Sequence, residues 1–460
     1  MDAHPPTVSL RQATAVWAKI GLLSFGGPAG QIALMHRELV ERRKWISEGR
    51  FLHALNYCML LPGPEAAQLA IYIGWLLHRT LGGLIAGLLF VLPGFVAILA
   101  LSFVYVLYDD VALVGAVFFG LKAAVLAVVL EAVLRIGRKA LKNALMVAIA
   151  VLAFVAIYFF KVPFPLIVLG AGLAGMLGQR LVPASFPGPA SIAGDLASDY
   201  VIDRQLAQGR LAHTRPSMLR AVRVTVAWLA IWWLPVVAVI RTFGADSVLA
   251  REGVFFSKAA MVTFGGAYAV LAYVAQRAVD GFAWVTPGQM LDGLALAETT
   301  PGPLIMVVQF VGFLGAFNHQ VGLTPWVAGV AASVLVTWVT FAPCFLWIFV
   351  GAPYVEALRG NRTLHAALSA VTAAVVGVIL NLSVWFALHT LFARVEQHRY
   401  GMLVLDIPQW PSLDWAALAL AVAALLAMLR FKVGIGWTLL GAGVAGTVWR
   451  LGVAEWFPGL

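Results

Sequence analysis

The chain has 460 residues, of which 62% are hydrophobic and only 11% are charged. Soluble domains carry roughly 25% charged residues, so this composition excludes a large soluble fold and indicates a polytopic membrane protein. The net charge of +10 comes from basic residues spread over short loops, which argues against nucleic-acid binding. The sequence has no phosphate-binding loop of a nucleotide-driven motor, so ion gradients are the expected source of energy.

Apolar stretches long enough to span a membrane follow one another along the chain, since about 20 apolar residues cross roughly 30 Å of hydrocarbon. The first group lies near 13–35, 56–77, 82–108, 113–134, 143–160 and 163–181. A hydrophilic stretch at 183–220 separates it from a second group near 221–242, 251–275, 290–317, 323–351, 365–391, 413–430 and 433–450. We therefore predict an all-α membrane protein with about thirteen transmembrane segments.

The two groups are related by an offset of 239 residues, which holds without a gap from Lys19 and Lys258 to Pro64 and Pro303. Phe-Gly-Gly at 25–27 matches 264–266, and Pro-Gly-Pro at 62–64 matches 301–303. Shared apolar composition does not align such residues in register, so an internal duplication is predicted. The expected organisation is an N-terminal repeat at 1–182, a hydrophilic linker at 183–220, a connecting helix at 221–250 and a C-terminal repeat at 251–460.

Charge predicts the orientation. With a cytoplasmic N-terminus and thirteen crossings, the linker lies inside and the C-terminus outside, as the positive-inside rule prefers. The basic segment at 36–50 then falls outside, against the rule; the alternative is a re-entrant hairpin at 56–77. Seven segments precede the second repeat, so that repeat is inverted, as in secondary transporters with a binding site near the membrane midplane.

Both Pro-Gly-Pro motifs are expected to break their helices, because proline donates no backbone hydrogen bond and glycine is conformationally free. Broken helices in lipid are tolerated only where protein or a water-filled cavity satisfies the backbone. The half-helix after each break presents free N–H groups and a positive dipole end, which favours an anion. The alternative is a proline kink used only for packing.

Further residues are expected along this anion path. The segments Phe25-Gly26-Gly27-Pro28 and Phe264-Gly265-Gly266 are either second breaks or sites of close helix packing. Lys19 and Lys258 are interpreted as cationic groups facing the path, or as side chains that snorkel to the interface. Four amides are candidates to donate hydrogen bonds to an oxyanion or to bridge helices: Gln31, Gln68, Asn56 and Gln309.

Ionisable groups inside membrane segments suggest a route for protons. Glu65 follows the first Pro-Gly-Pro and Glu298 precedes the second, so these two are the proton-coupling candidates. The alternative is a structural role as a helix cap, or an ion pair such as Lys122 with Glu131. His53 and Asp292 occupy equivalent positions in the two repeats. The nine histidines include no H-x-x-x-H pair, and no nucleophile motif occurs, so we expect no metal, no cofactor and no enzymatic activity.

Residues 25–75 and 256–317 resemble the two signature regions of the long, two-domain chromate ion transporters. The resemblance implies a multi-pass protein of the bacterial inner membrane that expels chromate and confers resistance, with sulfate as a competitor. The sequence leaves open whether the protein forms a homodimer. The family motif carries over to Phe25, Gly26, Gly27, Pro28, Pro62, Gly63, Pro64, Gly265, Gly266, Pro301, Gly302 and Pro303. The second motif reads FGGA where the first reads FGGP, so the halves need not contribute equally to the site.

Overall fold

A computed structural model describes residues 8–25, 27–108, 111–186, 200–264, 266–319, 322–354 and 362–453. The chain forms two compact units, each built from segments of both halves of the sequence. Unit 1 comprises Met1–Leu99, Gly188–Ala267 and Thr300–Arg362, and unit 2 comprises Ala100–Pro187, Tyr268–Thr299 and Thr363–Leu460.

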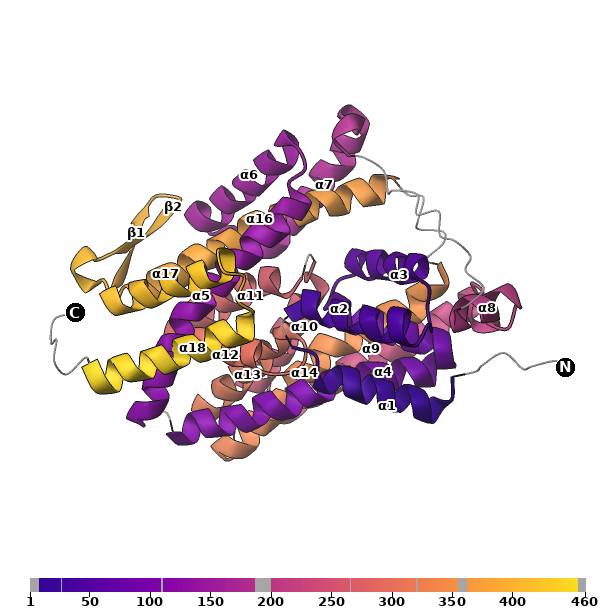
Figure 1. The fold of residues 1–460 in the computed structure, drawn as a ribbon, viewed down its shortest axis with the longest axis horizontal. Coiled ribbons are helices and arrows are strands. Elements are labelled where there is room, and N and C mark those ends of the chain that lie inside the picture. Colours follow the sequence, from indigo (N-terminus) through magenta and orange to yellow (C-terminus); the bar gives the residue numbers. More distant parts are fainter. Residues whose placement is uncertain are drawn as a thin grey trace. The chain divides into compact units, whose positions relative to one another are not determined.

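The helices are labelled in Figure 1. Those before the connecting helix are α1 (Leu10–Leu22), α2 (Gly27–His36), the π-helix η1 (Arg37–Arg42), α3 (Glu48–Leu60), α4 (Glu65–Tyr108), α5 (Ala112–Ala140), α6 (Ala144–Phe160), α7 (Phe164–Leu181), η2 (Pro183–Ser185), α8 (Val201–Ala207) and η3 (Ala212–Thr214). The connecting helix is α9 (Met218–Phe243).

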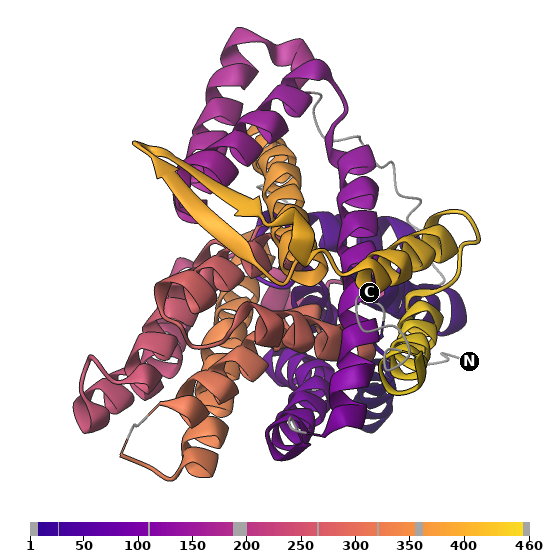
Figure 2. The ribbon, with the colours of Figure 1, turned by 90° about the vertical axis from the view of Figure 1, so that its left-hand side faces the viewer.

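The second half continues in the same order. It contains α10 (Val248–Met261), α11 (Ala267–Ala275), the π-helix η4 (Gln276–Gly281), α12 (Pro287–Thr299), η5 (Leu304–Met306), α13 (Val307–Asn318), α14 (Pro325–Gly351), η6 (Ala352–Tyr354), α16 (Arg362–Leu391), η7 (Trp410–Ser412), α17 (Trp415–Leu429), α18 (Ile435–Val448) and η8 (Trp449–Val453). Strands β1 (Val395–Tyr400) and β2 (Leu403–Pro408) pair antiparallel, with Val395 opposite Pro408. This hairpin lies against α6 and is drawn as paired arrows in Figure 2.

The local structure repeats at the offset expected from the sequence. Both π-helices η1 and η4, and both helices α3 and α12, have bounds that differ by 239 residues at each end. The positive φ angles repeat too: φ is 51° at Lys44 and 52° at Ala283, and 125° at Gly63 and 102° at Gly302. The predicted duplication therefore extends from sequence to backbone conformation.

The predicted helix breaks are confirmed at the level of the backbone. The expected segment 13–35 is two helices, α1 and α2, and the expected segment 56–77 is α3 followed by the start of α4. The same division occurs at 251–275 and 290–317. Each of these pieces is only 9 to 14 residues long, so none reaches across a bilayer alone.

Helix α4 is itself a hairpin, because His78 and Arg79 leave the helical conformation. We call residues 65–78 its first arm and residues 80–108 its second arm. The two arms pack closely where a Cβ on Gly74 would lie 2.4 Å from the Gly82 carbonyl oxygen. Six helices in the described residues are long and apolar enough to cross a membrane, counting α4 once, and the expected count of thirteen crossings is not confirmed.

The loop after η1 is bonded to the linker. Helix α8 begins with hydrogen bonds from the Val201 and Ile202 N–H groups to the carbonyls of Lys44 and Trp45. Asp203 accepts hydrogen bonds from the Ser47 N–H at 3.0 Å and from Arg50 Nε at 2.8 Å. Segments bonded in this way share one side of the membrane, so the expected placement of 36–50 opposite the linker is wrong.

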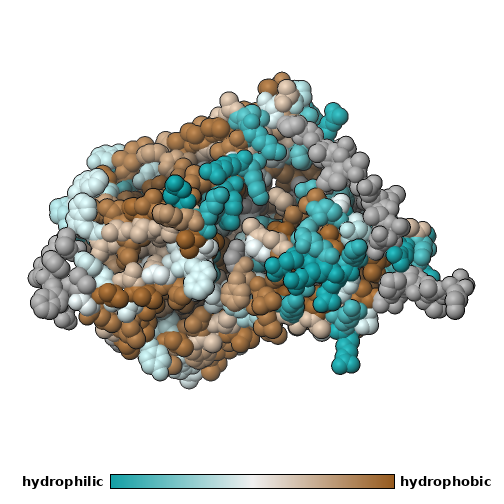
Figure 3. All heavy atoms as spheres, in the orientation of Figure 1, coloured by the Kyte–Doolittle hydropathy of each residue, from teal (hydrophilic) through white to brown (hydrophobic). Residues whose placement is uncertain are grey.

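The molecular surface has the polarity of a membrane protein. Apolar side chains are exposed on the long helices, for example Leu169, Leu173 and Leu177 on α7 and Val226 and Leu234 on α9. Figure 3 shows hydrophilic residues gathered over the region of α2 and α3, where Arg37, Glu41, Arg42, Lys44 and Glu48 are exposed. The polar surface thus contains the basic segment that follows α2.

Candidate functional site

The two Pro-Gly-Pro breaks in unit 1 are joined by reciprocal backbone hydrogen bonds. The Gly63 N–H donates to the Thr263 carbonyl at 2.8 Å, and the Gly302 N–H donates to the Ser24 carbonyl at 2.8 Å. Thr263 is the equivalent of Ser24 at the offset of 239. The glycine N–H of each break is therefore satisfied by the residue that precedes Phe-Gly-Gly in the other repeat, as backbone polar groups inside a membrane require.

Ser24 and Thr263 also terminate α1 and α10 in the same way. The Ser24 hydroxyl donates to the Ile20 carbonyl at 2.7 Å, and the Thr263 hydroxyl donates to the Ala259 carbonyl at 2.7 Å. Both side chains are fully buried. These bonds satisfy carbonyls at the end of a helix and leave the Ser24 and Thr263 carbonyls for the glycines of the opposite break.

Each break also lies against a proline-containing helix. A Cβ on Gly302 would lie 2.8 Å from the Gly94 Cα, which follows Pro93 in the second arm of α4. A Cβ on Gly63 would lie 3.1 Å from Cys344 Sγ, which follows Pro343 in α14. Only glycine fits both contacts and the positive φ at these two positions.

Two buried glutamines support the breaks. Gln31 Nε2 donates to the Gly302 carbonyl at 2.6 Å, and Gln68 Nε2 donates to the Pro62 carbonyl at 2.8 Å. Gln309 Nε2 donates to the Phe95 carbonyl at 3.0 Å. In this arrangement the three amides bridge helix segments, which is the alternative that the sequence left open; their role toward an oxyanion stays a prediction.

The N-terminal turn of α4 offers the most suitable backbone donors. Pro62 and Pro64 have no N–H, and the Gly63 N–H donates to the Thr263 carbonyl. The first helical hydrogen bond of α4 runs from the Gln68 N–H to the Pro64 carbonyl. The N–H groups of residues 65–67 precede this bond and are therefore the first backbone donors of the helix. Half-buried Glu65 stands at the start of this turn. Its Oε1 lies 3.6 Å from where a Cβ on Gly266 would be, so the carboxyl group reaches the Phe-Gly-Gly segment of the second repeat.

The Phe-Gly-Gly segments are breaks. Helix α1 ends at Leu22 and α2 begins at Gly27, with φ of 67° at Gly27 and 100° at Gly266. Phe25 is 48% exposed and Pro28 is half-buried. Gly26 and Gly265, both predicted site residues, lie outside the described residues.

The two predicted lysines differ in environment. Lys19 Nζ pairs with Glu38 Oε1 at 2.9 Å, and Arg42 pairs with the same oxygen at 2.8 Å. Burial alone would raise the pKa of Glu38, but the hydrogen bond and charge of Lys19 and the charge of Arg42 outweigh it and lower the pKa below its usual value. Lys258 is exposed on α10, and the residue equivalent to Glu38 is Arg277, so the second repeat has no matching ion pair at this position.

Unit 2 contains the second proton-coupling candidate. Glu298 is buried on α12 and accepts a hydrogen bond of 2.5 Å from the Tyr268 hydroxyl. Lys122 on α5 pairs with Asp292 at 3.1 Å, and the Tyr105 hydroxyl also donates to Asp292. The suggested pair of Lys122 with Glu131 is therefore wrong.

Glu131 pairs with Arg135 at 3.6 Å instead. Glu131 lies nine residues from Lys122, which is two and a half turns along α5, whereas Arg135 lies four residues away on the same face. The interface of α5 and α12 thus carries the ion pair of Lys122 with Asp292.

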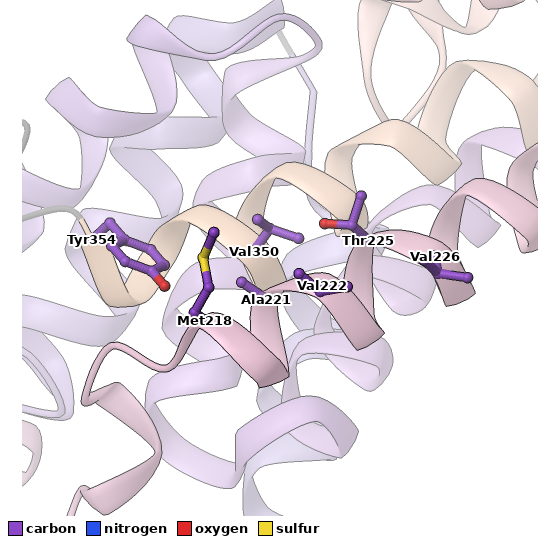
Figure 4. A pocket seen from close by; sticks show the side chains of 7 residues that line it. All are labelled: Met218, Ala221, Val222, Thr225, Val226, Val350 and Tyr354. Carbon is purple, nitrogen blue, oxygen red and sulfur yellow. The ribbon is translucent and has the colours of Figure 1, made fainter.

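An apolar groove in unit 1 does not suit an oxyanion. Its volume is about 390 Å³, and it lies along α9 and the end of α14 and η6, lined by Met218, Ala221, Val222, Thr225, Val226, Val350 and Tyr354. Figure 4 shows that these side chains are almost all apolar. A doubly charged anion would lose its hydration there without hydrogen bonds in return.

Sequence reasoning missed several residues that this site uses. Ser24 and Thr263 precede each Phe-Gly-Gly in register, a signal that was available. Gly94 and Cys344 each follow a proline, but at an offset of 250, which a fixed offset of 239 does not find. Asp203 gave no local signal, because its partners Ser47 and Arg50 lie more than 150 residues away.

Comparison with known proteins gives the family to which the chain is similar. Residues 11–176 and 252–447 match the family described as "Chromate transporter". The chain is 35% identical over 383 residues to the chromate transport protein of Pseudomonas aeruginosa, covering 82% of this chain and 81% of that protein. It is 29% identical over 430 residues to the chromate transport protein of Cupriavidus metallidurans, covering 93% and 90% of the two chains. No solved structure matches the chain significantly.

Proposed function

Because this chain belongs to the chromate transporter family, we propose that it is a secondary transporter that exports chromate from the cytoplasm across the bacterial inner membrane and so confers resistance. The observation that carries the proposal is the reciprocal junction of two broken segments in unit 1. Such irregular backbone inside a membrane protein is typical of transporter binding sites. Sulfate is the expected competitor, since it is also a tetrahedral dianion.

The membrane potential supports export. A potential of about −100 mV inside drives a dianion outward with about 4.6 kcal/mol, from about 2.3 kcal/mol per charge. Uptake against this potential would require co-transport of more than two positive charges. An exporter therefore needs only a path that alternates between the two sides, and coupling to protons adds to the driving force.

Contacts in unit 1 support two re-entrant hairpins in the first repeat. The Val8 carbonyl at the start of α1 lies 2.9 Å from His78 Nε2 at the end of the first arm of α4. The Trp75 carbonyl lies 3.0 Å from His213 Nε2 in the linker, and Arg50 is paired with Asp203 of α8. Hence α1 with α2, and α3 with the first arm of α4, each leave one side and return to it.

Unit 2 supports the same arrangement at the opposite side. Asp280 and Gln276 in η4 line one small pocket with Lys161 after α6 and Asp406 in β2. Counting crossings from a cytoplasmic N-terminus places Lys161 outside, after the second arm of α4, α5 and α6. The segment after α11 is then also outside, so α10 with α11 forms a hairpin that enters from the outer face.

The resulting topology has nine crossings: the second arm of α4, α5, α6, α7, α9, α14, α16, α17 and α18. The first repeat supplies two re-entrant hairpins from the cytoplasmic side, and the second repeat supplies two from the outer side. The N-terminus, the linker and the basic segment 36–50 are cytoplasmic, so the objection of the positive-inside rule disappears. Five crossings precede α10, an odd number, so the second repeat is inverted and suits alternating access.

Chromate would bind at the junction of the two Pro-Gly-Pro breaks in unit 1, against the first turn of α4 and its equivalent at Leu304. Glu65 occupies this region, and its carboxylate would repel a dianion. It must therefore be neutral or turned away when chromate is bound, which links anion binding to a proton.

Counterflow of labelled chromate in proteoliposomes tests the function. A carrier exchanges external labelled chromate for internal unlabelled chromate, and sulfate inside should substitute partly. A channel gives no counterflow against the net gradient, and an intramembrane enzyme gives no flux. Absence of chromate counterflow, with protein correctly inserted, would refute the proposal.

A further inference from the structure

Unit 1 contains a carboxyl group that the proposed anion site does not use. Glu252 lies on α10 and is completely buried. Neither of its carboxyl oxygens has a hydrogen-bond partner among the described residues. An unpaired carboxylate in such a place is very unfavourable, whereas a neutral carboxylic acid is far less so.

A glycine lies beside this side chain. A Cβ on Gly312 of α13 would lie 3.7 Å from Glu252 Oε2 and 2.7 Å from a methyl carbon of Val336 on α14. The equivalent positions in the first repeat are Ala13 and Ile73, both buried. The second repeat thus carries a large acidic side chain opposite glycine where the first carries a small apolar one and an isoleucine.

Among the described residues, the helices packed against α10 bring no compensating charge to Glu252. Helices α13 and α14 carry no Asp, Glu, Lys, Arg or His within their bounds. Helix α9 contacts α10 at Val236, and the nearest charged residue on α9 is exposed Arg241, one and a half turns away. On α10 itself Arg251 is exposed and paired with Asp246, and Lys258 is exposed. The unpartnered hydroxyl of buried Ser333 lies one turn from Val336 on α14.

From this geometry we propose that Glu252 is a proton-binding site of the transporter, protonated in this conformation and deprotonated when the helices around it separate. The exchange involves only the carboxyl O–H bond: the proton is taken from water on the outer side and released to water in another conformation. A metal cation would need several oxygen ligands, and no polar atom among the described residues is hydrogen-bonded to Glu252. The proton is the ligand that fits two unpaired oxygens.

Its position suits coupling. Gly312 lies ten residues beyond Gly302 along η5 and α13, about 15 Å by the rise of a helix. In the proposed topology this direction leads to the outer face, so Glu252 lies between the hairpin junction and the outside. Its role in coupling depends on the proposed transport function, whereas its protonation does not.

Infrared spectroscopy of the purified, full-length protein tests protonation without any substrate. Wild type should show a carboxylic C=O band, at the high-frequency end expected without hydrogen bonds, that persists at neutral pH. Glu252→Gln should lose this band, and Glu41→Gln, which alters an exposed carboxylate, should keep it. An unchanged band in Glu252→Gln would overturn the proposal.

Transport with a clamped potential tests coupling. A pH gradient should accelerate chromate efflux in wild type and in Glu41→Gln, whereas in Glu252→Gln the rates with and without the gradient should become equal. If Glu252→Gln misfolds, Glu252→Met, which has a side chain of similar length without an ionisable group, should give the same result. A wild-type response to the pH gradient in either variant would overturn the coupling role, and failure of wild type to move chromate would refute the transport function without affecting the infrared result.

Discussion

Gly63 and Gly302 concentrate the steric demands of the junction. Both have positive φ, and both meet neighbours that leave no room for a side chain. A β-branched residue there adds roughly 1–2 kcal/mol of backbone strain and disrupts the reciprocal bonds to Thr263 and Ser24.

We therefore expect Gly63→Val and Gly302→Val to abolish chromate efflux while the protein remains in the membrane. Gly115→Val is the matched control, because nothing lies within 4 Å of that position and its φ is not positive. Chromate uptake into inverted vesicles, which corresponds to export from the cell, and membrane protein levels are the measurements. Retained efflux in both site variants at normal protein levels would disprove the role of the broken helices.

Glu65 and Glu298 stay the proton-coupling candidates at the junction and in unit 2. Glu65 reaches the Gly266 segment, and Glu298 is held by Tyr268. If either exchanges a proton for chromate, its Gln variant should uncouple efflux from the pH gradient and keep part of the voltage-driven efflux. Vesicles with an imposed pH gradient and a clamped potential measure this, with Glu41→Gln as the control. An unaltered response to the pH gradient in Glu65→Gln and Glu298→Gln would assign both residues to structure.

At the scale of elements, the positions of proline and glycine predicted the helix boundaries better than the lengths of the apolar stretches did. The breaks at 61–64 and 300–303 follow from proline and glycine, whose effect on a helix needs no tertiary context. The reversal at His78 and Arg79 has no such residues at the turn, and it depends on the contact of Gly74 with Gly82. Counting apolar residues therefore merged pairs of short helices into single expected crossings.

The docking of α8 is a second element that sequence could not predict, because it depends on one side chain with distant partners. Asp203 is 8% exposed and accepts hydrogen bonds from the Ser47 N–H and Arg50 Nε. Hydrogen bonds to a charged group contribute about 1.5–3 kcal/mol each. The linker is thus expected to be held against the loop before α3.

Asp203→Ala should release α8 and expose the linker. Hydrogen exchange at the Ser47 amide should become faster, and limited proteolysis should cut residues 200–215 sooner. Asp246→Ala is the control, since Asp246 is 98% exposed and its pair with Arg251 lies at the surface. Equal proteolysis of wild type and Asp203→Ala would show that α8 is held by other contacts.

At the scale of the whole molecule, the proposed mechanism depends on the side from which each repeat enters the membrane. Unit 1 shows that each Pro-Gly-Pro break is bonded to the Phe-Gly-Gly segment of the other repeat. A pair of hairpins from one side can meet its equivalent pair from the other side in this way only if the repeats are inverted. The decisive quantity is therefore the sidedness of equivalent positions in the two repeats.

Lys44 and Ala283 provide such a pair. They are equivalent at the offset of 239, both are exposed, and both already hold a non-glycine residue at φ near 50°, so cysteine adds little strain. Nine crossings with re-entrant hairpins predict that Lys44→Cys is labelled from the cytoplasm and Ala283→Cys from outside. Thirteen crossings predict the reverse for both.

A membrane-impermeant thiol reagent, applied to intact spheroplasts and to inverted vesicles, distinguishes the two topologies. Gln208→Cys in the linker and Met402→Cys beside β2 are exposed controls that lie inside and outside, respectively, in either topology. The buried native cysteines, Cys58 and Cys344, should not react in either preparation. Labelling of Lys44→Cys from outside, with both controls behaving as expected, would reject the hairpins and with them the meeting of inverted repeats at the anion site.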